Sequence, residues 1–198
     1  TPRAPFPYKT LEVRIAHQNG HVLAGELMLP DGVTRPPVVV FITGSGPQDR
    51  DESLMNHQPF LVIADHLARN GIASLRCDDR GVGDSTGDFS QAITTDFATD
   101  VIAQVEWLST RQDIESSEIG LIGHSEGGVV APIAAVSDRR IMFIVLMAGT
   151  GVDGGEILSS QSRRILELEG YSEETLVPMM VAHRALMALV RNDASETE

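Results

Sequence analysis

The sequence predicts an α/β fold: a mostly parallel sheet, an antiparallel amino-terminal hairpin and a helical segment at the end of the chain. Between residues 38 and 148, short apolar runs alternate with stretches of helical spacing. This alternation indicates parallel strands that are joined by helical crossovers. The chain has 198 residues, of which 42% are hydrophobic, enough for one substantial core.

The individual elements follow from the spacing of their apolar residues. Residues 10–17 and 21–29 alternate apolar and polar side chains, and Asn19-Gly20 between them is a hairpin signal. Continuous apolar runs predict buried strands, and a 3.6-residue spacing predicts helices. The predicted strands are 38–43, 72–75, 118–123 and 141–148, and the predicted helices are 60–70, 94–110 and 127–136.

The two ends of the chain differ from this central part. The proline-rich residues 1–9 predict an extended arm before a core at 10–150. After a glycine-rich loop, helices are expected at 157–169 and 173–191, and Pro178 either begins the second helix or bends it. Residues 151–198 are therefore expected to form a separate helical cap.

Composition excludes several function classes. The formal net charge of −13 disfavours binding to nucleic acid or to anionic membranes, and the run 141–148 is too short to span a bilayer. The single cysteine, Cys77, rules out an internal disulfide, and the six histidines lack metal-ligand spacing. We expect no metal or organic cofactor. The cellular compartment stays open, because the arm is compatible with a removed leader and with cytoplasmic residence.

The motif Gly-His-Ser-Glu-Gly-Gly at 123–128 carries the strongest chemical signal. It follows a predicted strand and opens a predicted helix, the setting of a nucleophile elbow. A sharp turn there exposes the Ser125 hydroxyl, and the N–H of Glu126 becomes available to a developing oxyanion. The alternative is a glycine-rich turn with an incidental serine.

Two further motifs follow buried strands. Residues 43–50, Thr-Gly-Ser-Gly-Pro-Gln-Asp-Arg, can supply a second oxyanion N–H from Ser45, Gly46 or Gln48, unless they form a plain glycine turn. In Asp-Asp-Arg-Gly-Val-Gly-Asp-Ser at 78–85, Arg80 and the acids are either catalytic or, as we expect, a buried ion pair.

These three motifs, in this order, resemble the α/β-hydrolase superfamily over about residues 10–150. The branch most similar to the sequence is that of the dienelactone-hydrolase and prolyl-oligopeptidase-like serine esterases. The resemblance implies that Ser125 is the acyl nucleophile and that Glu126, Ser45 and Gly46 form the oxyanion hole. It also implies a small ester substrate, and the segment after residue 150 resembles a lid.

The rest of a catalytic triad is not evident in this sequence. In the resembled family an acid and then a histidine follow the serine. Asp153 is a candidate acid, whereas His124, His183, His66 and His57 are better explained as structural or exposed residues. We therefore expect the chain to be a fragment, inactive alone, whose apolar edge at 141–148 is covered by the remaining chain or by a partner subunit.

Other functions remain compatible with the same residues. A thioesterase, a peptidase or an acyltransferase would use the same serine chemistry on a different substrate. A non-catalytic hydrolase-like binding module would retain Ser125 without a base. A downstream acid and histidine would distinguish the enzymes from the binding module.

Overall fold

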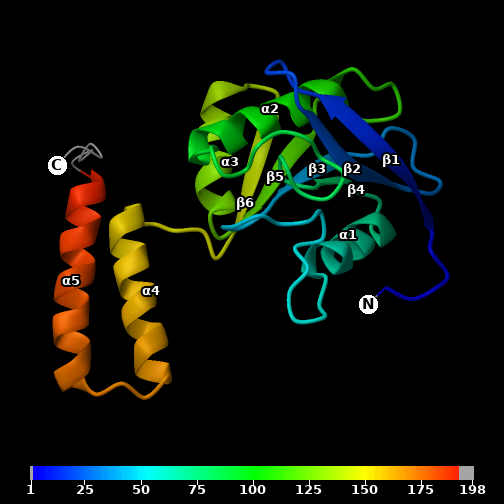
Figure 1. The fold of residues 1–198 in the computed structure, drawn as a ribbon. Helices are drawn as coiled ribbons and strands as arrows, with labels where there is room; N and C mark the ends of the chain where they lie inside the picture. The colour runs from blue at the N-terminus through cyan, green and yellow to red at the C-terminus, as the bar shows by residue number, and fades with distance from the viewer. Residues whose placement is uncertain (1, 192–198) are drawn as a thin grey trace. The chain divides into compact units, whose positions relative to one another are not determined.

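The computed structural model describes residues 2–191, and the first 149 residues build a six-stranded sheet with helices on both faces (Figure 1). The strand order is β1-β2-β4-β3-β5-β6. The strands are β1 Tyr8–Ala16, β2 Val22–Pro30, β3 Val38–Ile42, β4 Ala73–Cys77, β5 Ile119–His124 and β6 Ile141–Met147. The pairs β4–β3, β3–β5 and β5–β6 are parallel, whereas β1–β2 and β2–β4 are antiparallel. The predicted fold class is confirmed.

Helices α1 (Pro59–Arg69), α2 (Thr94–Ser109) and α3 (Gly127–Ser137) cover the sheet. Phe60 of α1 packs on one face, in a cluster with Phe41 of β3. Val105 of α2 and Ala131 of α3 pack on the opposite face, in the larger cluster. Every residue of β3 and of β4 is buried, which explains the continuous apolar run of β3. β4 also buries two polar side chains, Ser74 and Arg76.

The amino-terminal hairpin has a longer connection than the Asn19-Gly20 signal suggests. β1 and β2 pair from Tyr8–Pro30 to Ala16–Val22, so five residues lie between the strands. Gly20 adopts a φ of +92°, whereas Asn19 is not in the left-handed region. The Asn19 N–H instead donates to His17 Nδ1 at 3.1 Å. The side chain of His17 therefore takes part in the turn, which a pattern of turn residues does not reveal.

Several boundaries differ from their predicted positions by a few residues. β1 begins at Tyr8, inside the predicted arm, because Tyr8 already pairs with Pro30 of β2. Helix α4 (Gly154–Leu168) begins three residues earlier than predicted. The reason is its N-cap residue, Asp153, whose side chain accepts the Glu156 N–H at 2.9 Å. Helix α5 (Glu173–Arg191) has its predicted bounds, with Pro178 inside the helix.

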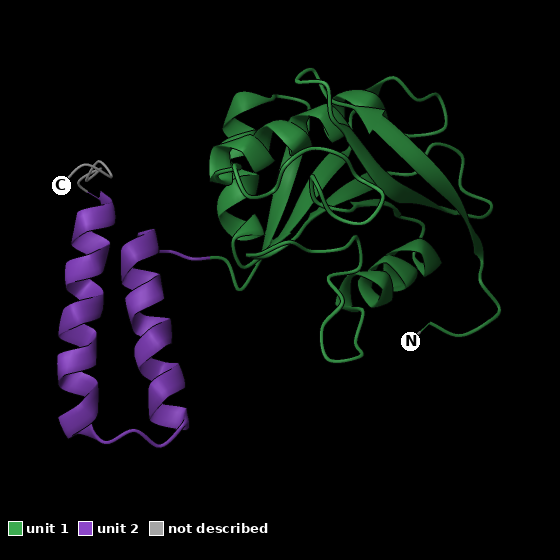
Figure 2. Ribbon diagram, in the orientation of Figure 1, with its two compact units in different colours: residues 1–149 green, residues 150–198 purple. Residues whose placement is uncertain are grey.

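The chain divides into two compact units, Thr1–Gly149 and Thr150–Glu198 (Figure 2). Within the described part of the second unit, α4 and α5 form a helical pair. α4 has no buried residue, and α5 buries only Leu176 and Met180. None of the helices within residues 2–191 is both long and apolar enough to cross a lipid bilayer.

Strand β6 forms one edge of the sheet. Its apolar side chains are largely exposed: Met142 is 62% exposed, Phe143 46% and Leu146 47%. The other edge strand, β1, alternates exposed polar and buried apolar residues instead. An exposed apolar edge of this kind favours association with another strand or surface.

Candidate active site

Ser125 occupies the turn between β5 and α3, in the strand–turn–helix setting that the motif predicts. Its φ of +52° lies in the left-handed region, which costs a residue with a side chain roughly 1–3 kcal/mol. Glycines permit the close approach of the flanking elements: a Cβ on Gly123 would lie 2.1 Å from the Gly127 carbonyl oxygen. The Ser125 N–H donates to the Met147 carbonyl at 2.9 Å and ties the turn to β6.

Glu126 follows the serine and starts helix α3. Its carbonyl accepts the N–H groups of Val129 and Val130, at 2.7 and 3.0 Å. Its own N–H has no partner among residues 2–191. The Glu126 carboxylate accepts a hydrogen bond from the Thr94 hydroxyl at 2.9 Å. An unpaired amide next to the serine, at a helix amino terminus, is the donor that an oxyanion requires.

The loop 43–52 lies against this turn. A Cβ on Gly44 would lie 3.3 Å from the Ser125 Cβ. The Gly44 N–H already donates to Glu52 Oε1 at 2.7 Å, and the Gln48 N–H donates to Asp79 at 2.9 Å. The N–H groups of Ser45 and Gly46 have no partner in the described part of the chain. These two predicted residues are therefore among the amides of this loop that have no partner within residues 2–191.

Asp79, which follows β4 in the loop 78–85, fixes the start of the loop 43–52. Its carboxylate accepts the Thr43 hydroxyl at 2.7 Å in addition to the Gln48 N–H. Burial raises the pKa of Asp79 to about 6, although both hydrogen bonds act to lower it. A carboxyl group with a raised pKa thus holds the loop next to Ser125.

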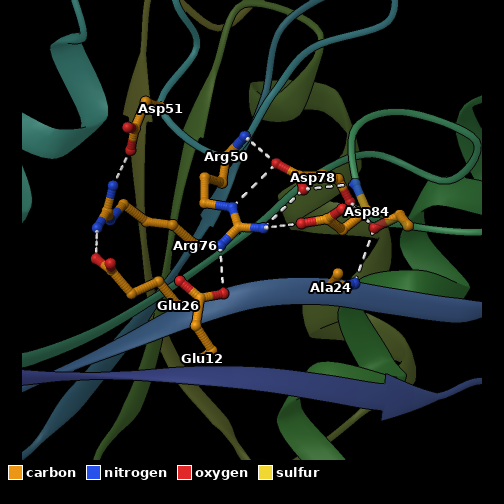
Figure 3. A network of polar contacts seen from close by, with 9 residues as sticks. Glu12, Ala24, Glu26, Arg50, Asp51, Arg76, Asp78 and Asp84 are labelled. Carbon is orange, nitrogen blue, oxygen red and sulfur yellow. Dashed lines mark hydrogen bonds and ion pairs between the residues drawn. The ribbon is translucent and has the colours of Figure 1, made fainter.

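Arg50 and Asp78 join the loop 43–52 to the loop 78–85 (Figure 3). Arg50 donates to the Asp78 carboxylate through its backbone N–H, Nε and Nη2, at 2.9, 3.1 and 2.8 Å, and through Nη1 to Glu12. The Asp84 N–H adds a further donor at 3.3 Å. Burial acts to raise the pKa of Asp78, but the charge and hydrogen bonds of Arg50 and the Asp84 N–H together outweigh it and lower the pKa.

A second arginine, Arg76 of β4, lies beside this pair (Figure 3). Its side chain is 1% exposed and contacts the carboxylates of Glu26 and Asp51. Burial lowers the pKa of Arg76, against the attraction of Glu26. Since Asp51 belongs to the glycine-containing loop, both arginines hold that loop to the sheet.

Arg80 forms a buried ion pair, as expected, but its partner is Asp100 of helix α2 rather than an acid of its own motif. Its Nε lies 2.7 Å from Asp100 Oδ2 in helix α2, and the other Asp100 oxygen lies 2.7 Å from His21 Nε2. His17 stacks on His21 with ring centroids 4.2 Å apart. Burial lowers the pKa of His17, so its ring tends to be neutral.

His17, His21 and Asp100 are close enough together to suggest a metal ion, since their ligand atoms lie within 4.8 Å of one another. The hydrogen bonds do not fit one. His17 Nδ1 accepts the Asn19 N–H, so its neutral ring carries hydrogen on Nε2, the atom nearer to Asp100. A metal ligand needs a lone pair on that nitrogen, and Arg80 already neutralises Asp100.

A cavity of about 40 Å³ adjoins the turn and is lined in part by Gly44, Asp79 and Glu126. The buried Oε1 of Gln104, another lining residue, has no partner within residues 2–191. A volume of this size accommodates a few water molecules or a small chemical group. Cys77 also lines the cavity, but burial raises the pKa of its thiol, which disfavours the nucleophilic thiolate.

The candidate acid Asp153 and the distant histidine His183 lie beside and within the helices α4 and α5, respectively. Asp153 caps α4 and also accepts from Arg191 Nη2 at 3.1 and 3.2 Å, so its carboxylate has a structural role. His183 lies in α5 with a buried, unpartnered Nε2 in the described structure. Both belong to the second unit, whereas Ser125 belongs to the first.

Sequence reasoning missed Glu52. Its Oε1 lies 2.7 Å from His124 Nδ1 as well as from the Gly44 nitrogen, next to the serine turn. The available signal was weak: an acidic residue soon after a glycine-containing loop. Because His124 lies 72 positions further along the chain, no local pattern joins the two residues.

Comparison with known proteins identifies the family. The family model of X-Pro dipeptidyl-peptidase (S15 family) matches residues 19–181. The chain belongs to this family. Esterase EstD of Thermotoga maritima is 29% identical to this S15 family member over 156 residues, 78% of the chain and 37% of the esterase. A 31.7 kDa protein from the traX-finO intergenic region of Escherichia coli is 32% identical over 129 residues, 65% of this chain and 43% of that protein.

The fold of this S15 family member also matches solved structures. Esterase Pf2001 of Pyrococcus furiosus superposes with a TM-score of 0.65 and 19% identity, covering 89% of this chain and 66% of the esterase. The matches confirm the resemblance to the serine-esterase branch of the α/β hydrolases. The chain spans 37% and 43% of the length of these two curated relatives.

Proposed function

We propose that the complete protein is a serine hydrolase, most directly a carboxylesterase that forms an acyl-enzyme on Ser125. The observation that carries the proposal is the strained turn at Ser125, with the unpaired amides of Glu126, Ser45 and Gly46 nearby. A nucleophile beside free N–H donors is the arrangement needed for acyl transfer. No metal or organic cofactor takes part in the proposed reaction.

In this reaction the Ser125 hydroxyl oxygen attacks the ester carbonyl carbon while a base takes the hydroxyl proton. The carbonyl oxygen becomes an oxyanion, which the free amides stabilise. The oxyanion collapses, and the alcohol leaves with the proton. Water then attacks the acyl-enzyme in the same way, releasing the carboxylic acid and restoring the serine.

We further propose that the base, and an acid to orient it, lie in a longer protein of which this chain is a fragment. The chain covers only 37% and 43% of its two curated relatives, which supports this proposal. Asp153 is the alternative acid within the chain. The same longer protein, or a partner subunit, would cover the exposed edge of β6. Residues 151–198 would serve as the lid.

The substrate class has two candidates. The esterase name of the Thermotoga maritima relative favours carboxylic esters. The family description favours a second candidate, a peptidase that releases X-Pro dipeptides. Both reactions use the same nucleophile and oxyanion hole. Thioesters and acyl transfer to other acceptors are further variants of this chemistry, and a binding module without catalysis is the alternative in a different class.

A paired assay on the full-length protein tests the proposal. We expect turnover of short p-nitrophenyl esters to exceed that of an X-Pro p-nitroanilide, and Ser125→Ala to abolish both. Ser90→Ala, at an exposed serine on a surface loop, is the matched control and should leave both rates unchanged. Preference for the anilide would favour the peptidase, and ester turnover by Ser125→Ala would refute the nucleophile.

A further inference from the structure

We propose that Glu52 is a positioning residue that holds the oxyanion loop against the nucleophile turn. This proposal rests on the proposed function of Ser125. Glu52 Oε1 accepts the Gly44 N–H at 2.7 Å and lies 2.7 Å from His124 Nδ1. One carboxylate oxygen therefore joins the loop that supplies oxyanion donors to the residue directly before the serine.

The hydrogen-bond geometry defines the tautomer of His124. An ionised carboxylate can only accept hydrogen bonds, so the Nδ1 atom facing Glu52 carries the hydrogen. The glutamate is 8% exposed, whereas the His124 side chain is 39% exposed. A nearly buried carboxylate requires partners of this kind, and here it finds both at the edge of the candidate site.

The backbone of Glu52 gives a second, independent indication. Its φ is +52°, in the left-handed region that a glycine adopts without penalty. A glutamate there costs roughly 1 kcal/mol or more in backbone strain. Ser125 has the same φ of +52°. A strained residue that places its carboxylate between two parts of the site indicates that the side chain is needed.

The expected role follows from what the contact fixes. The Gly44 N–H belongs to the peptide group directly before the free Ser45 amide, and Gly44 has no side chain to restrict rotation. By holding the Gly44 N–H, Glu52 sets the direction of the following amide next to Ser125. It also removes the Gly44 N–H itself from the set of free donors. The loop is therefore already ordered when the oxyanion forms, and this preorganisation stabilises the transition state.

The test uses the full-length protein with Glu52→Gln, Glu52→Ala and Glu52→Gly. Removing one oxyanion donor from a hydrolase lowers kcat by about 10²–10³-fold, so misdirecting one should lower it by about 10–100-fold. We expect this loss in Glu52→Ala and Glu52→Gly, with KM changed less than about threefold because substrate binding does not use the carboxylate. Glu52→Gln keeps an accepting oxygen and should retain part of kcat.

Two features of the design separate positioning from simple folding defects. Glu52→Gly adopts the left-handed backbone without strain, so a loss of kcat in this variant is not caused by strain at residue 52. Glu115→Gln is the control: its carboxylate also accepts a loop N–H, that of Ser117, but in the loop before β5 rather than after β3. Its kcat should stay within about twofold of the natural protein.

A spectroscopic readout completes the test. The ¹⁵N chemical shifts of the His124 ring should report hydrogen on Nδ1 in the natural protein and a mixture of tautomers in Glu52→Ala. Full kcat in Glu52→Ala and Glu52→Gly, or a ring that keeps hydrogen on Nε2 in the natural protein, would overturn the proposal. If Ser125→Ala also stays active, the proposed function itself fails, which is a distinct outcome.

Discussion

The two compact units of this chain are stabilised in different ways. In the first unit, β3, β4 and most of β5 are fully buried, and charged side chains such as Arg76 and Asp78 lie inside the polar network (Figure 3). In the second unit, α4 buries nothing and α5 buries two residues. Its exposed apolar side chains include Leu158, Ile165, Leu168, Val177, Val181, Leu186, Leu189 and Val190.

Two ion pairs illustrate the same difference. In the first unit Arg50 pairs with an Asp78 side chain that is 5% exposed, 28 positions along the chain. In the second unit Arg164 pairs with Glu167 three positions away, and Arg164 is 68% exposed. The first kind of pair requires the tertiary fold, whereas the second requires only a helix. Equivalent substitutions should therefore have unequal effects in the two units.

The largest difference in stability is expected for truncated leucines. Leu121 of β5 is completely buried, so Leu121→Ala should lower the free energy of unfolding by about 3–4 kcal/mol through lost burial and a residual cavity. Leu168→Ala, at a side chain that is 71% exposed, should change it by less than about 0.5 kcal/mol. Urea unfolding followed by circular dichroism measures both. Equal effects would show that the units do not differ as described.

The ion pairs give a smaller difference. Arg50→Met leaves the buried Asp78 carboxylate with backbone N–H donors alone, and we expect a loss of about 2–3 kcal/mol. Arg164→Met removes an exposed pair and should cost less than about 0.5 kcal/mol. The same urea titrations apply. A loss at Arg164 as large as that at Arg50 would contradict the contrast between tertiary and local pairs.

A pH effect of still smaller size should be confined to the first unit. The folded pKa of Asp79, about 6, lies above its ordinary value of 3.8. Folding therefore favours the neutral carboxyl over the ionised one. The stability that this preference contributes is fully present below pH 3.8 and is lost as the pH rises through about 6. Relative to Asp79→Asn, the natural chain should lose about 2 kcal/mol of unfolding free energy between pH 4 and 8.

This prediction is checked by unfolding both proteins at several pH values and comparing the two stability curves. Parallel curves would mean that Asp79 does not titrate in this range. Asp113→Asn provides a control, because hydrogen bonding from Arg111 lowers the pKa of that carboxyl instead. Its stability difference should appear only at lower pH.

Much of the first unit was predictable from local patterns. The continuous apolar runs at β3 and β5, and the Gly-x-Ser-x-Gly turn between β5 and α3, locate Ser125 at the end of a buried strand. These features are local because burial on both faces demands an unbroken apolar run, and a tight turn demands glycine. The amides of Ser45, Gly46 and Glu126, which have no partner within residues 2–191, are donors of the kind that the oxyanion prediction requires.

The polar contacts of the site were not predictable in the same way. Glu52 meets His124 across 72 positions, and Asp79 holds Gln48 across 31. Such pairs depend on which strands become neighbours in the sheet and leave no periodic signal. The neighbouring strands β3, β4 and β5 bring the three loops together, and only then does burial raise the pKa of Asp79. The start of α4 was missed because it depends on one cap, Asp153.

The central claim is that Ser125 is an activated nucleophile, and covalent labelling tests it most directly. The full-length protein is treated with a fluorophosphonate, which reacts with activated serines, and the modified peptide is located by mass spectrometry. We expect one phosphonyl adduct, on Ser125, that Ser125→Ala abolishes and Ser90→Ala retains. A full-length protein that stays unlabelled, or that is labelled only at another serine, would contradict the claim.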